Sequence, residues 1–248
     1  MKSDVSVITV CFNSVKSIED TIKSVISQGS IVKEHLIIDG GSTDGTLEIV
    51  KKYLRKVEKL NLQSGPDKGI FDAINKGLAI AKGDWVALLH ADDIYSDSTI
   101  LEECVAKAGP DHNVIYGNLK IVRYGKVYRK WCPGELKQQS LNLGWMPPHP
   151  TVIIKNELIK KIGRYSIDYE ISSDFEYCQR LFRNINCKPY YWDCYMINMS
   201  FGGISTKGLK AEYIKLKEDL KIMKMYQINP IFGVAHKKLG KLFQFISG

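Results

Sequence analysis

The sequence lacks paired cysteines and long apolar runs. Its six cysteines are scattered with no C-x-x-C pair, which argues against a zinc ribbon and against a disulfide framework. No apolar run approaches the roughly 20 residues that a membrane-spanning helix needs. Met1 to Asp4 lead directly into the alternating segment 5–10, so we expect no secretory signal. These absences favour a globular cytosolic protein with reduced thiols.

The sequence also lacks a G-x-G-x-x-G fingerprint after its first predicted strand, which disfavours a dinucleotide-dependent oxidoreductase. With 44% hydrophobic residues, the composition is that of a soluble globular protein. A chain of 248 residues can form one large α/β domain, or such a domain with an appendage.

The positive charge is concentrated near the C-terminus. Residues 207–248 contain nine lysines and three acidic residues, and so account for +6 of the formal net charge of +8. This field would attract a nucleic acid as well as an anionic membrane. Because no recognised nucleic-acid-binding motif accompanies the charge, a nucleic-acid-binding protein is the weaker alternative.

The tail, residues 206–248, contains two predicted helices separated by Asn229-Pro230. In the second, apolar residues recur at steps of three and four, while most lysines fall off this stripe. Such a helix lies on a membrane surface, or packs its apolar side on the body with its lysines in solvent, and both interpretations are open. The stripe consists of Ile231, Ala235, Leu239, Leu242 and Ile246, and the lysines are Lys237, Lys238 and Lys241.

The first 90 residues alternate between predicted strands and helices. Strands separated by helices pair in parallel, which indicates an α/β fold. Ser42 or Thr43 is expected to cap the second helix. The strands are predicted at 5–10, 35–38 and 85–89, and the helices at 14–28, 46–55 and 70–78.

The pattern beyond Asp93 is mixed. Gly117-Asn118 separates two short predicted strands, and a proline-rich loop excludes regular structure at 144–150. Strands are predicted at 114–116, 119–122 and 190–198, a hairpin turn at 123–126, and helices at 157–162 and 173–183.

The strand at 85–89 runs directly into His90, Ala91, Asp92 and Asp93. Ligands bind at the carboxyl ends of strands in open α/β sheets, and two adjacent acids repel each other unless a cation compensates them. We therefore expect a divalent metal that holds a phosphate. Asn13 and Asp39 follow neighbouring strands and would reach the same edge, although Asp39 alone also suits a turn.

The order of several segments resembles that of the family 2 glycosyltransferases, which are inverting nucleotide-sugar enzymes of the GT-A fold. The resemblance covers about residues 4–205 and is closest to small bacterial enzymes that build O-antigen, capsule or exopolysaccharide repeat units. It implies a mainly parallel, Rossmann-like mixed sheet flanked by helices. The matching segments are Val7 to Asn13, Ile37 to Thr46, Asp67 to Gly77, the strand that ends in Asp92-Asp93, and Ser173 to Glu176.

The resemblance also implies an organisation along the chain. Residues 1–205 form the catalytic domain, in which 1–95 bind the donor and 96–205 bind the acceptor. Residues 206–248 form the basic helical tail, with possible membrane association. The segment Phe201 to Ser205 resembles a loop that closes over the site in relatives.

On the donor side, the resemblance implies that Thr9 and Asp39 contact the uracil or ribose of a UDP-sugar. Asn13 belongs to the same donor region, and Lys68 lies where a cation near the diphosphate is expected. Asp92 falls on the last acid of the D-x-D element and would ligate Mn²⁺ or Mg²⁺. Asp93 would support the metal or the sugar.

The sequence departs from the family at His90, which stands where the first acid of D-x-D is expected. An imidazole ligates Mn²⁺ or donates to a ribose or phosphate oxygen, but it does not replace both functions of a carboxylate. A nucleotide-sugar-binding protein without transferase activity is therefore an alternative.

On the acceptor side, the resemblance implies that Asp174 is the catalytic base, although its position also suits a helix N-cap. Glu176 is a candidate for binding the acceptor sugar. His149 is a candidate for contacting the donor diphosphate or the acceptor, and Trp145 for stacking on a sugar. For both, packing is the alternative.

Together these features predict a metal-dependent glycosyltransferase that moves glucose or galactose from UDP onto a sugar of undecaprenyl diphosphate. The product would enter O-antigen or another surface polysaccharide. The basic tail would hold the enzyme peripherally at the cytoplasmic face of the bacterial plasma membrane.

Overall fold

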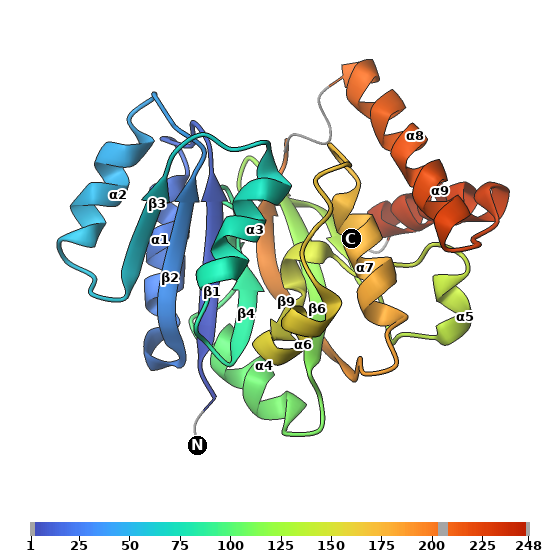
Figure 1. The fold of residues 1–248 in the computed structure, drawn as a ribbon, viewed down its shortest axis with the longest axis horizontal. Helices are drawn as coiled ribbons and strands as arrows, with labels where there is room; N and C mark the ends of the chain where they lie inside the picture. The colour runs from blue at the N-terminus through green and yellow to red at the C-terminus, as the bar shows by residue number, and fades with distance from the viewer. Residues whose placement is uncertain (1–2, 203–207, 247–248) are drawn as a thin grey trace.

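The computed structural model describes residues 3–202 and 208–246. Within these residues, nine strands form one mixed sheet of order β3-β2-β1-β4-β8-β6-β9-β5, and β7 pairs with β6. Helices cover both faces of the sheet (Figure 1), which confirms the predicted α/β fold. The strands are β1 (Val5–Cys11), β2 (Val32–Asp39), β3 (Leu60–Ser64), β4 (Trp85–Leu88), β5 (Ile94–Tyr95), β6 (Val114–Arg123), β7 (Lys126–Trp131), β8 (Ile153–Lys155) and β9 (Pro189–Ser200).

Strands β1 to β4 pair with one another in parallel. All seven residues of β1 are buried, as expected for a central strand covered on both faces. The register places Cys11 opposite Asp39 and Asp39 opposite Ser64. The carboxyl ends of these strands therefore form one edge, called the rim below, as the alternation of strands and helices predicted.

The second half of the sheet differs from the prediction at Gly117 and Asn118. Residues 114–123 form the single strand β6, which runs parallel to β9 with register shifts at these two residues. A Cβ at Gly117 would lie 2.7 Å from the sulfur of Met196 and 2.8 Å from a backbone oxygen of Trp192. This glycine permits close packing inside a strand, so interpreting it as a break was wrong.

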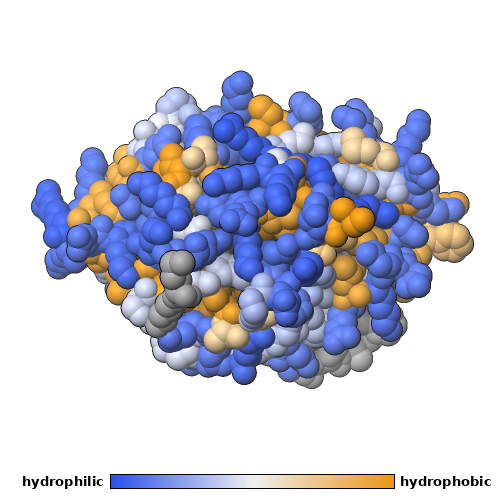
Figure 2. Space-filling model, turned by 60° about the horizontal axis from the view of Figure 1, so that its bottom comes forward, coloured by the Kyte–Doolittle hydropathy of each residue, from blue (hydrophilic) through white to orange (hydrophobic). Residues whose placement is uncertain are grey.

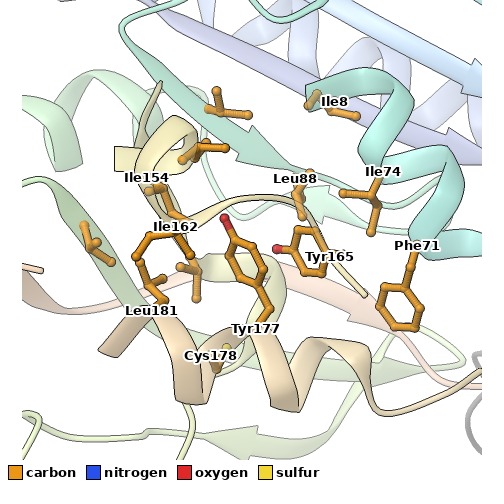
Figure 3. Packing of buried hydrophobic residues seen from close by; sticks show 14 of the residues in the cluster. Ile8, Phe71, Ile74, Leu88, Ile154, Ile162, Tyr165, Tyr177, Cys178 and Leu181 are labelled. Atoms are coloured by element: carbon orange, nitrogen blue, oxygen red, sulfur yellow. The ribbon is translucent and has the colours of Figure 1, made fainter. Parts of the chain in front are cut away.

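The helices form a layer on each face. Ile8 and Leu88 of the sheet pack against Ile74 of α3 and Tyr177 of α7, and Tyr165 lies between Phe71 of α3 and Tyr177 (Figure 3). Each large side chain buried in this way contributes roughly 1.5–3 kcal/mol. The helices are α1 (Ile18–Ser27), α2 (Thr46–Leu54), α3 (Ile70–Ile80), α4 (Ile100–Ala108), α5 (Gln138–Leu141), α6 (Asn156–Ile162), α7 (Ser173–Phe182), α8 (Gly208–Met225) and α9 (Pro230–Ile246).

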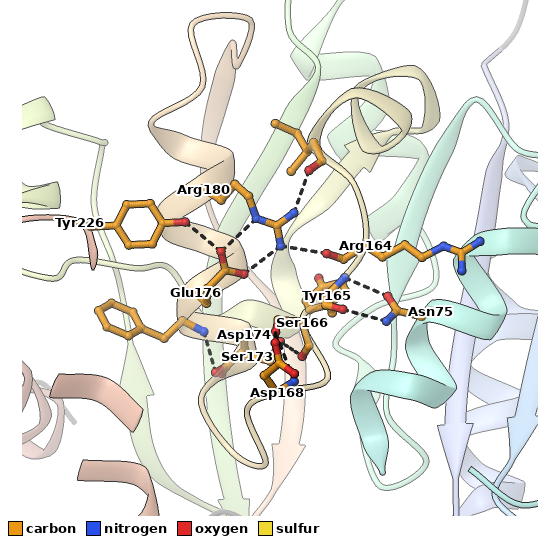
Figure 4. A network of polar contacts seen from close by, with 12 residues as sticks. Asn75, Arg164, Tyr165, Ser166, Asp168, Ser173, Asp174, Glu176, Arg180 and Tyr226 are labelled. Atoms are coloured by element: carbon orange, nitrogen blue, oxygen red, sulfur yellow. Dashed lines mark hydrogen bonds and ion pairs between the residues drawn. The ribbon is translucent and has the colours of Figure 1, made fainter. Parts of the chain in front are cut away.

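Asn75 connects the two halves of the domain. It lies on α3, and its side-chain amide donates to the backbone oxygen of Tyr165 at 2.9 Å while its carbonyl accepts from the N–H of Tyr165 at 2.9 Å (Figure 4). Tyr165 belongs to the segment between α6 and α7. The side-chain amide of Asn75 thus makes the same pair of hydrogen bonds to Tyr165 that the backbone of a neighbouring strand would make.

The start of α2 also differs from the prediction. Its N-cap is Gly45 at φ 98°, and neither Ser42 nor Thr43 caps it. Asp44 instead accepts a hydrogen bond from the N–H of Thr46 at 3.0 Å. A glycine takes the cap position here because its backbone is in the left-handed region.

The tail packs against the start of α7. Ile222 and Met223 of α8 form a buried cluster with Tyr169 and Phe175. The tail has two helices as predicted, and α9 begins at Pro230. Figure 1 shows both helices at the end of the molecule opposite α2 and β3. Among the described residues, no helix combines the length and the apolar character needed to cross a membrane.

The orientation of α9 contradicts the interpretation that its apolar stripe packs against the body with the lysines in solvent, whereas the membrane-surface interpretation stays a prediction. Ile231 and Leu239 are 78% and 53% exposed, so they do not pack against the body. Lys237 is directed inward and forms an ion pair with Asp219 at 2.9 Å, so it is not a solvated lysine. The side chains of Lys241, Leu242 and Ile246 lie outside the described part of the chain.

The face at the amino ends of β1 and β2 is mainly hydrophilic. Its hydrophobic side chains form small, separate areas in Figure 2. Such scattered exposure is ordinary for a protein surface. The polar groups that converge lie at the opposite edge of the parallel strands.

Candidate active site

Asp39 is the central carboxylate of the rim, and it is 1% exposed. It accepts hydrogen bonds from the N–H of Gly41 at 3.0 Å, from Ser42 Oγ at 2.5 Å and from Ser64 Oγ at 2.7 Å. Burial raises the pKa of Asp39, but these hydrogen bonds outweigh it, and the net pKa is below its ordinary value. The ionised side chain therefore fixes the loop after β2.

Asn13 fixes the neighbouring loop after β1. Its backbone has a φ of 49°, a left-handed conformation that asparagine tolerates. Its N–H donates to Ser42 Oγ at 2.8 Å, and its side-chain oxygen accepts from the N–H of Thr43 at 2.9 Å. Thr9, by contrast, is completely buried, with Oγ1 2.8 Å from His35 Nε2, so the structure does not bring its side chain to the rim surface.

Phe12 and Asp67 flank Gly40 at the rim. A Cβ at Gly40 would lie 2.6 Å from Asp67 Oδ2 and 3.5 Å from Phe12 Cδ2. Phe12 is 62% exposed although it directly follows a buried strand, and Lys68 is also exposed. An open aromatic ring beside a carboxylate suits a nucleobase. The sequence interpretation assigned no binding role to Phe12 or to Asp67, which it treated as a turn residue. For Phe12, a large apolar residue in the turn after β1 was the available signal.

The two acids after β4 have different surroundings. Asp93 is 1% exposed and accepts from the N–H of Ser200 at 3.2 Å; burial and then the charge of Asp92 raise its pKa well above the ordinary value. Asp92 is partly exposed, and within the described residues its carboxylate has no hydrogen bond or ion pair. Asp92 is therefore the acid whose carboxylate is free to bind a metal. The buried carboxylate of Asp93 instead holds the backbone of Ser200.

Few protein ligands surround Asp92. In the described ranges, no three His, Cys, Asp or Glu side chains gather as a metal-binding group. An exposed carboxylate with free oxygens is still the hard ligand that Mg²⁺ and Mn²⁺ prefer, and substrate phosphates commonly supply the other ligands. The residues present thus fit a metal that is bound together with a diphosphate.

His90 and His149 form a pair beside these acids. Their ring centroids are 6.4 Å apart with planes inclined by 29°, and His149 Nε2 lies 2.8 Å from Tyr165 Oη. Burial lowers the pKa of His149 to about 4 against the opposing charge of Asp174. Burial also lowers the pKa of His90, opposed by the charges of Asp92 and Asp174. Both rings are therefore neutral at pH 7.

Asp174 is the second residue of α7. It is partly exposed, and its Oδ1 accepts from the N–H of Phe175 at 2.7 Å (Figure 4). The N-cap of α7 is Ser172, so the alternative that Asp174 caps the helix is wrong. Because its charge acts on both histidines, the structure brings Asp174 to the same site as Asp92.

Glu176 and Trp145 lie in packed surroundings, and the structure does not bring them into the open site. Glu176 accepts from Arg180 Nη2 at 2.8 Å and from Tyr226 Oη at 2.8 Å (Figure 4). Trp145 is 8% exposed and donates to the backbone oxygen of Pro133 at 3.1 Å. Of the loop at 201–205, residues 203–205 lie outside the described residues.

Known proteins resemble this chain in sequence. The model of the family described as glycosyl transferase family 2 matches residues 6–185. An uncharacterized glycosyltransferase of Mycobacterium tuberculosis is 33% identical over 211 residues, which cover 82% of this chain and 77% of that protein.

Solved structures resemble it in fold. Residues 1–349 of Staphylococcus aureus TarS in complex with UDP superpose with a TM-score of 0.70 at 20% identity, covering 91% of this chain and 66% of that chain, slightly under two thirds. A mannosyltransferase from Pyrobaculum calidifontis in complex with GDP-Man and Mn²⁺ has a TM-score of 0.65 at 17% identity, covering 96% and 69%. At these identities the likeness concerns the fold alone.

Proposed function

This chain belongs to glycosyltransferase family 2, and we propose that it transfers glucose or galactose, with inversion, from a UDP-sugar to a sugar on undecaprenyl diphosphate. The observation that carries the proposal is the placement of Asp92 and Asp174 around the neutral His90–His149 pair. One acid is free to hold a metal at a diphosphate, and the other is free to accept a proton. The product would enter O-antigen or another surface polysaccharide.

The rim would bind the nucleotide. Uracil would stack on the exposed ring of Phe12, and its N3–H would be donated to Asp67 or Asp39. Lys68 would place a positive charge near the diphosphate. The UDP complex of TarS, which has a similar fold, supports a uridine nucleotide as the donor.

Asp92 would hold Mn²⁺ or Mg²⁺ together with diphosphate oxygens, and the Mn²⁺ complex of the mannosyltransferase supports this assignment. The metal supplies positive charge that offsets the negative charge of departing UDP. His90 would ligate the metal or donate to a phosphate oxygen, since a neutral imidazole does either. Asp93 would support this segment from beneath through Ser200.

Asp174 would act on the acceptor. Its carboxylate would take the proton of the acceptor hydroxyl while that oxygen forms a bond to C1 of the sugar and the bond from C1 to UDP breaks on the opposite face. Only Oδ1 has a hydrogen-bond partner among the described residues, so Oδ2 is available for this proton. His149, held by Tyr165, would donate to the diphosphate or the acceptor.

The test uses the full chain with Mn²⁺, UDP-glucose or UDP-galactose, and synthetic GlcNAc- or GalNAc-diphospho-undecaprenol. Release of UDP together with a new glycolipid is the expected result. Asp174→Asn should lower transfer by about 100- to 10,000-fold, leaving a measurable residue, and retain UDP binding. Asp168→Asn, which changes an exposed acid on the preceding segment, should transfer normally. Normal transfer by Asp174→Asn would refute the base assignment. UDP-sugar binding without transfer to any acceptor would favour the binding-protein alternative that His90 raises.

The tail would bind the membrane that carries the acceptor. Leu209, Tyr213, Leu216 and Leu220 follow one another at steps of four, three and four on α8, and they are 86%, 68%, 44% and 37% exposed. The exposed Lys217 and nearby lysines flank this α8 stripe, and each basic residue near an anionic surface contributes about 1 kcal/mol. These features support peripheral binding at the cytoplasmic face of the bacterial plasma membrane.

Vesicle partitioning tests this binding. Replacing Leu216 and Leu220 by Ser should reduce partitioning onto vesicles that contain phosphatidylglycerol. Ile185→Ser, which removes a 96% exposed apolar side chain elsewhere, should leave it unchanged. Equal partitioning of the tail variant and the parent protein would contradict membrane binding by α8.

A further inference from the structure

Glu218 on α8 accepts hydrogen bonds from three consecutive backbone N–H groups. The donors are Glu170 at 2.7 Å, Ile171 at 3.0 Å and Ser172 at 2.8 Å. Ser172 is the N-cap of α7, where a helix leaves N–H groups without intrahelical partners and its dipole favours a negative charge. A carboxylate from the tail thus holds the segment that leads into Asp174.

Two further contacts from the tail fall on the other side of Asp174. Tyr226 donates to Glu176 Oε1 at 2.8 Å, as Figure 4 shows. Lys237 Nζ lies 3.2 Å from the ring centroid of Phe175, which is completely buried, and this ammonium group also pairs with Asp219. The tail therefore fixes the backbone before Asp174 and the side chains directly after it.

We propose that Glu218 is a positioning residue for Asp174, so that α8 and α9 complete the catalytic apparatus. This inference rests on the proposed function, in which Asp174 is the base. The first turn of α7 sets the direction of the Asp174 carboxylate, and the segment 170–172 sets the position of that turn. Without Glu218, three N–H groups lose their acceptor and the segment relaxes. A displacement of a catalytic group by about 1 Å lowers the rate by about 100-fold.

The experiment compares Glu218→Ala and Glu218→Gln with Glu212→Gln, which removes the charge of an exposed glutamate on the same helix. The acceptor is synthetic GlcNAc- or GalNAc-diphospho-undecaprenol, and the donor is the better of UDP-glucose and UDP-galactose. We expect Glu218→Ala to lower kcat by about 10- to 100-fold, with KM for the donor and Kd for UDP changed by less than about twofold. Glu218→Gln should lose less, because its amide oxygen still accepts, and Glu212→Gln should match the parent.

Two other measurements separate positioning from a general loss of structure. Amide hydrogen exchange at 170–172 should accelerate in both Glu218 variants while circular dichroism stays that of the parent. In an Asp174→Asn background, Glu218→Ala should cause no further loss of residual transfer, because both changes act on one group. If Glu218→Ala does not fold, Glu218→Gln provides the same comparison.

The outcomes distinguish this inference from the proposed function. Three results would overturn the positioning role alone. They are an unchanged kcat in both Glu218 variants, a loss of UDP affinity as large as the loss of kcat, and an additive loss of transfer in the Asp174→Asn background. Normal transfer by Asp174→Asn would overturn the assignment of the base, whatever the Glu218 variants do.

Discussion

The rings of His90 and His149 stack on each other with their centroids 6.4 Å apart, and Tyr165 holds the second ring by a hydrogen bond. His90 stands where the family resemblance of the sequence implies the first acid of D-x-D. A carboxylate there would stand two residues from Asp92 and repel it in the absence of a metal. The imidazole avoids this repulsion because it carries no negative charge in either protonation state.

Replacing His90 by Asp should therefore tighten the metal site. We expect the Mn²⁺ concentration for half-maximal transfer to fall by about tenfold, since a second hard oxygen ligand becomes available. Without metal, the melting temperature should fall because two acids then face each other. Transfer rates and melting curves measured over a Mn²⁺ series check both effects. His90→Asn, which adds no charge, is the control. If His90→Asp and His90→Asn require the same Mn²⁺ concentration for half-maximal transfer, the result would speak against metal binding at this position.

His149 should make the protein less stable in acid. Its pKa is about 4 in the folded state, lowered by burial from 6.5. Between these two values the unfolded chain binds a proton that the folded chain does not, so stability decreases as the pH falls from 6.5 to 4. The full shift corresponds to about 3 kcal/mol. Urea unfolding at pH 7 and pH 4.5 measures the decrease, and His149→Gln should reduce it. If His149→Gln loses as much stability between pH 7 and pH 4.5 as the parent protein, the protonation of His149 does not cause the loss.

Phe12→Ala should weaken donor binding. Stacking of a base on an aromatic ring contributes roughly 1–3 kcal/mol, so we expect Kd for UDP to rise by about tenfold or more. The free energy of unfolding should barely change, because the ring is 62% exposed. Calorimetric titration with UDP gives the affinity. Tyr124→Ala, which removes a 91% exposed ring from the β6–β7 turn, serves as control. Equal affinities of the two variants would place the nucleobase elsewhere.

Arg180→Leu should destabilise the protein strongly. It leaves the buried carboxylate of Glu176 with Tyr226 alone, and removing one partner of a buried ion pair costs about 3–5 kcal/mol. Because Arg180 keeps some exposure, we expect a loss near 3 kcal/mol in the free energy of unfolding, measured with urea. Arg164→Leu changes an exposed side chain and should cost less than about 0.5 kcal/mol. Similar losses in both variants would contradict the importance of the Glu176 pair.

The part of the fold formed by β1 to β4 was readily predicted from the sequence. Buried strands separated by amphipathic helices leave parallel pairing as the simple solution, and this brings Asn13, Asp39 and Asp92 to one rim. The part that follows β4 was harder to predict. The strand β8 has three residues, follows a proline-rich loop and inserts antiparallel between β4 and β6, and no local pattern specifies such an insertion.

The site shows the same division. The roles of Asp92 and Asp174 could be proposed from the sequence and stay predictions: Asp92 directly follows a buried strand, and the resemblance to the family marks the position of Asp174. Glu176 has packed surroundings because Arg180, one turn later, and Tyr226, 50 residues later, both bind its carboxylate. The first contact is an ordinary i,i+4 pair that a sequence can indicate, whereas the second depends on how the tail folds back. Lys237 is buried for a similar reason, since its partner Asp219 lies on another helix.

The double hydrogen bond between Asn75 and the backbone of Tyr165 limits how the enzyme can move. A hinge that moved α3 away from the segment between α6 and α7 would break both bonds at once and expose the packed rings around Tyr165. The two halves should therefore behave as one rigid body during turnover. Substrate entry and product release then depend on motions of surface segments around a catalytic framework whose internal distances stay fixed.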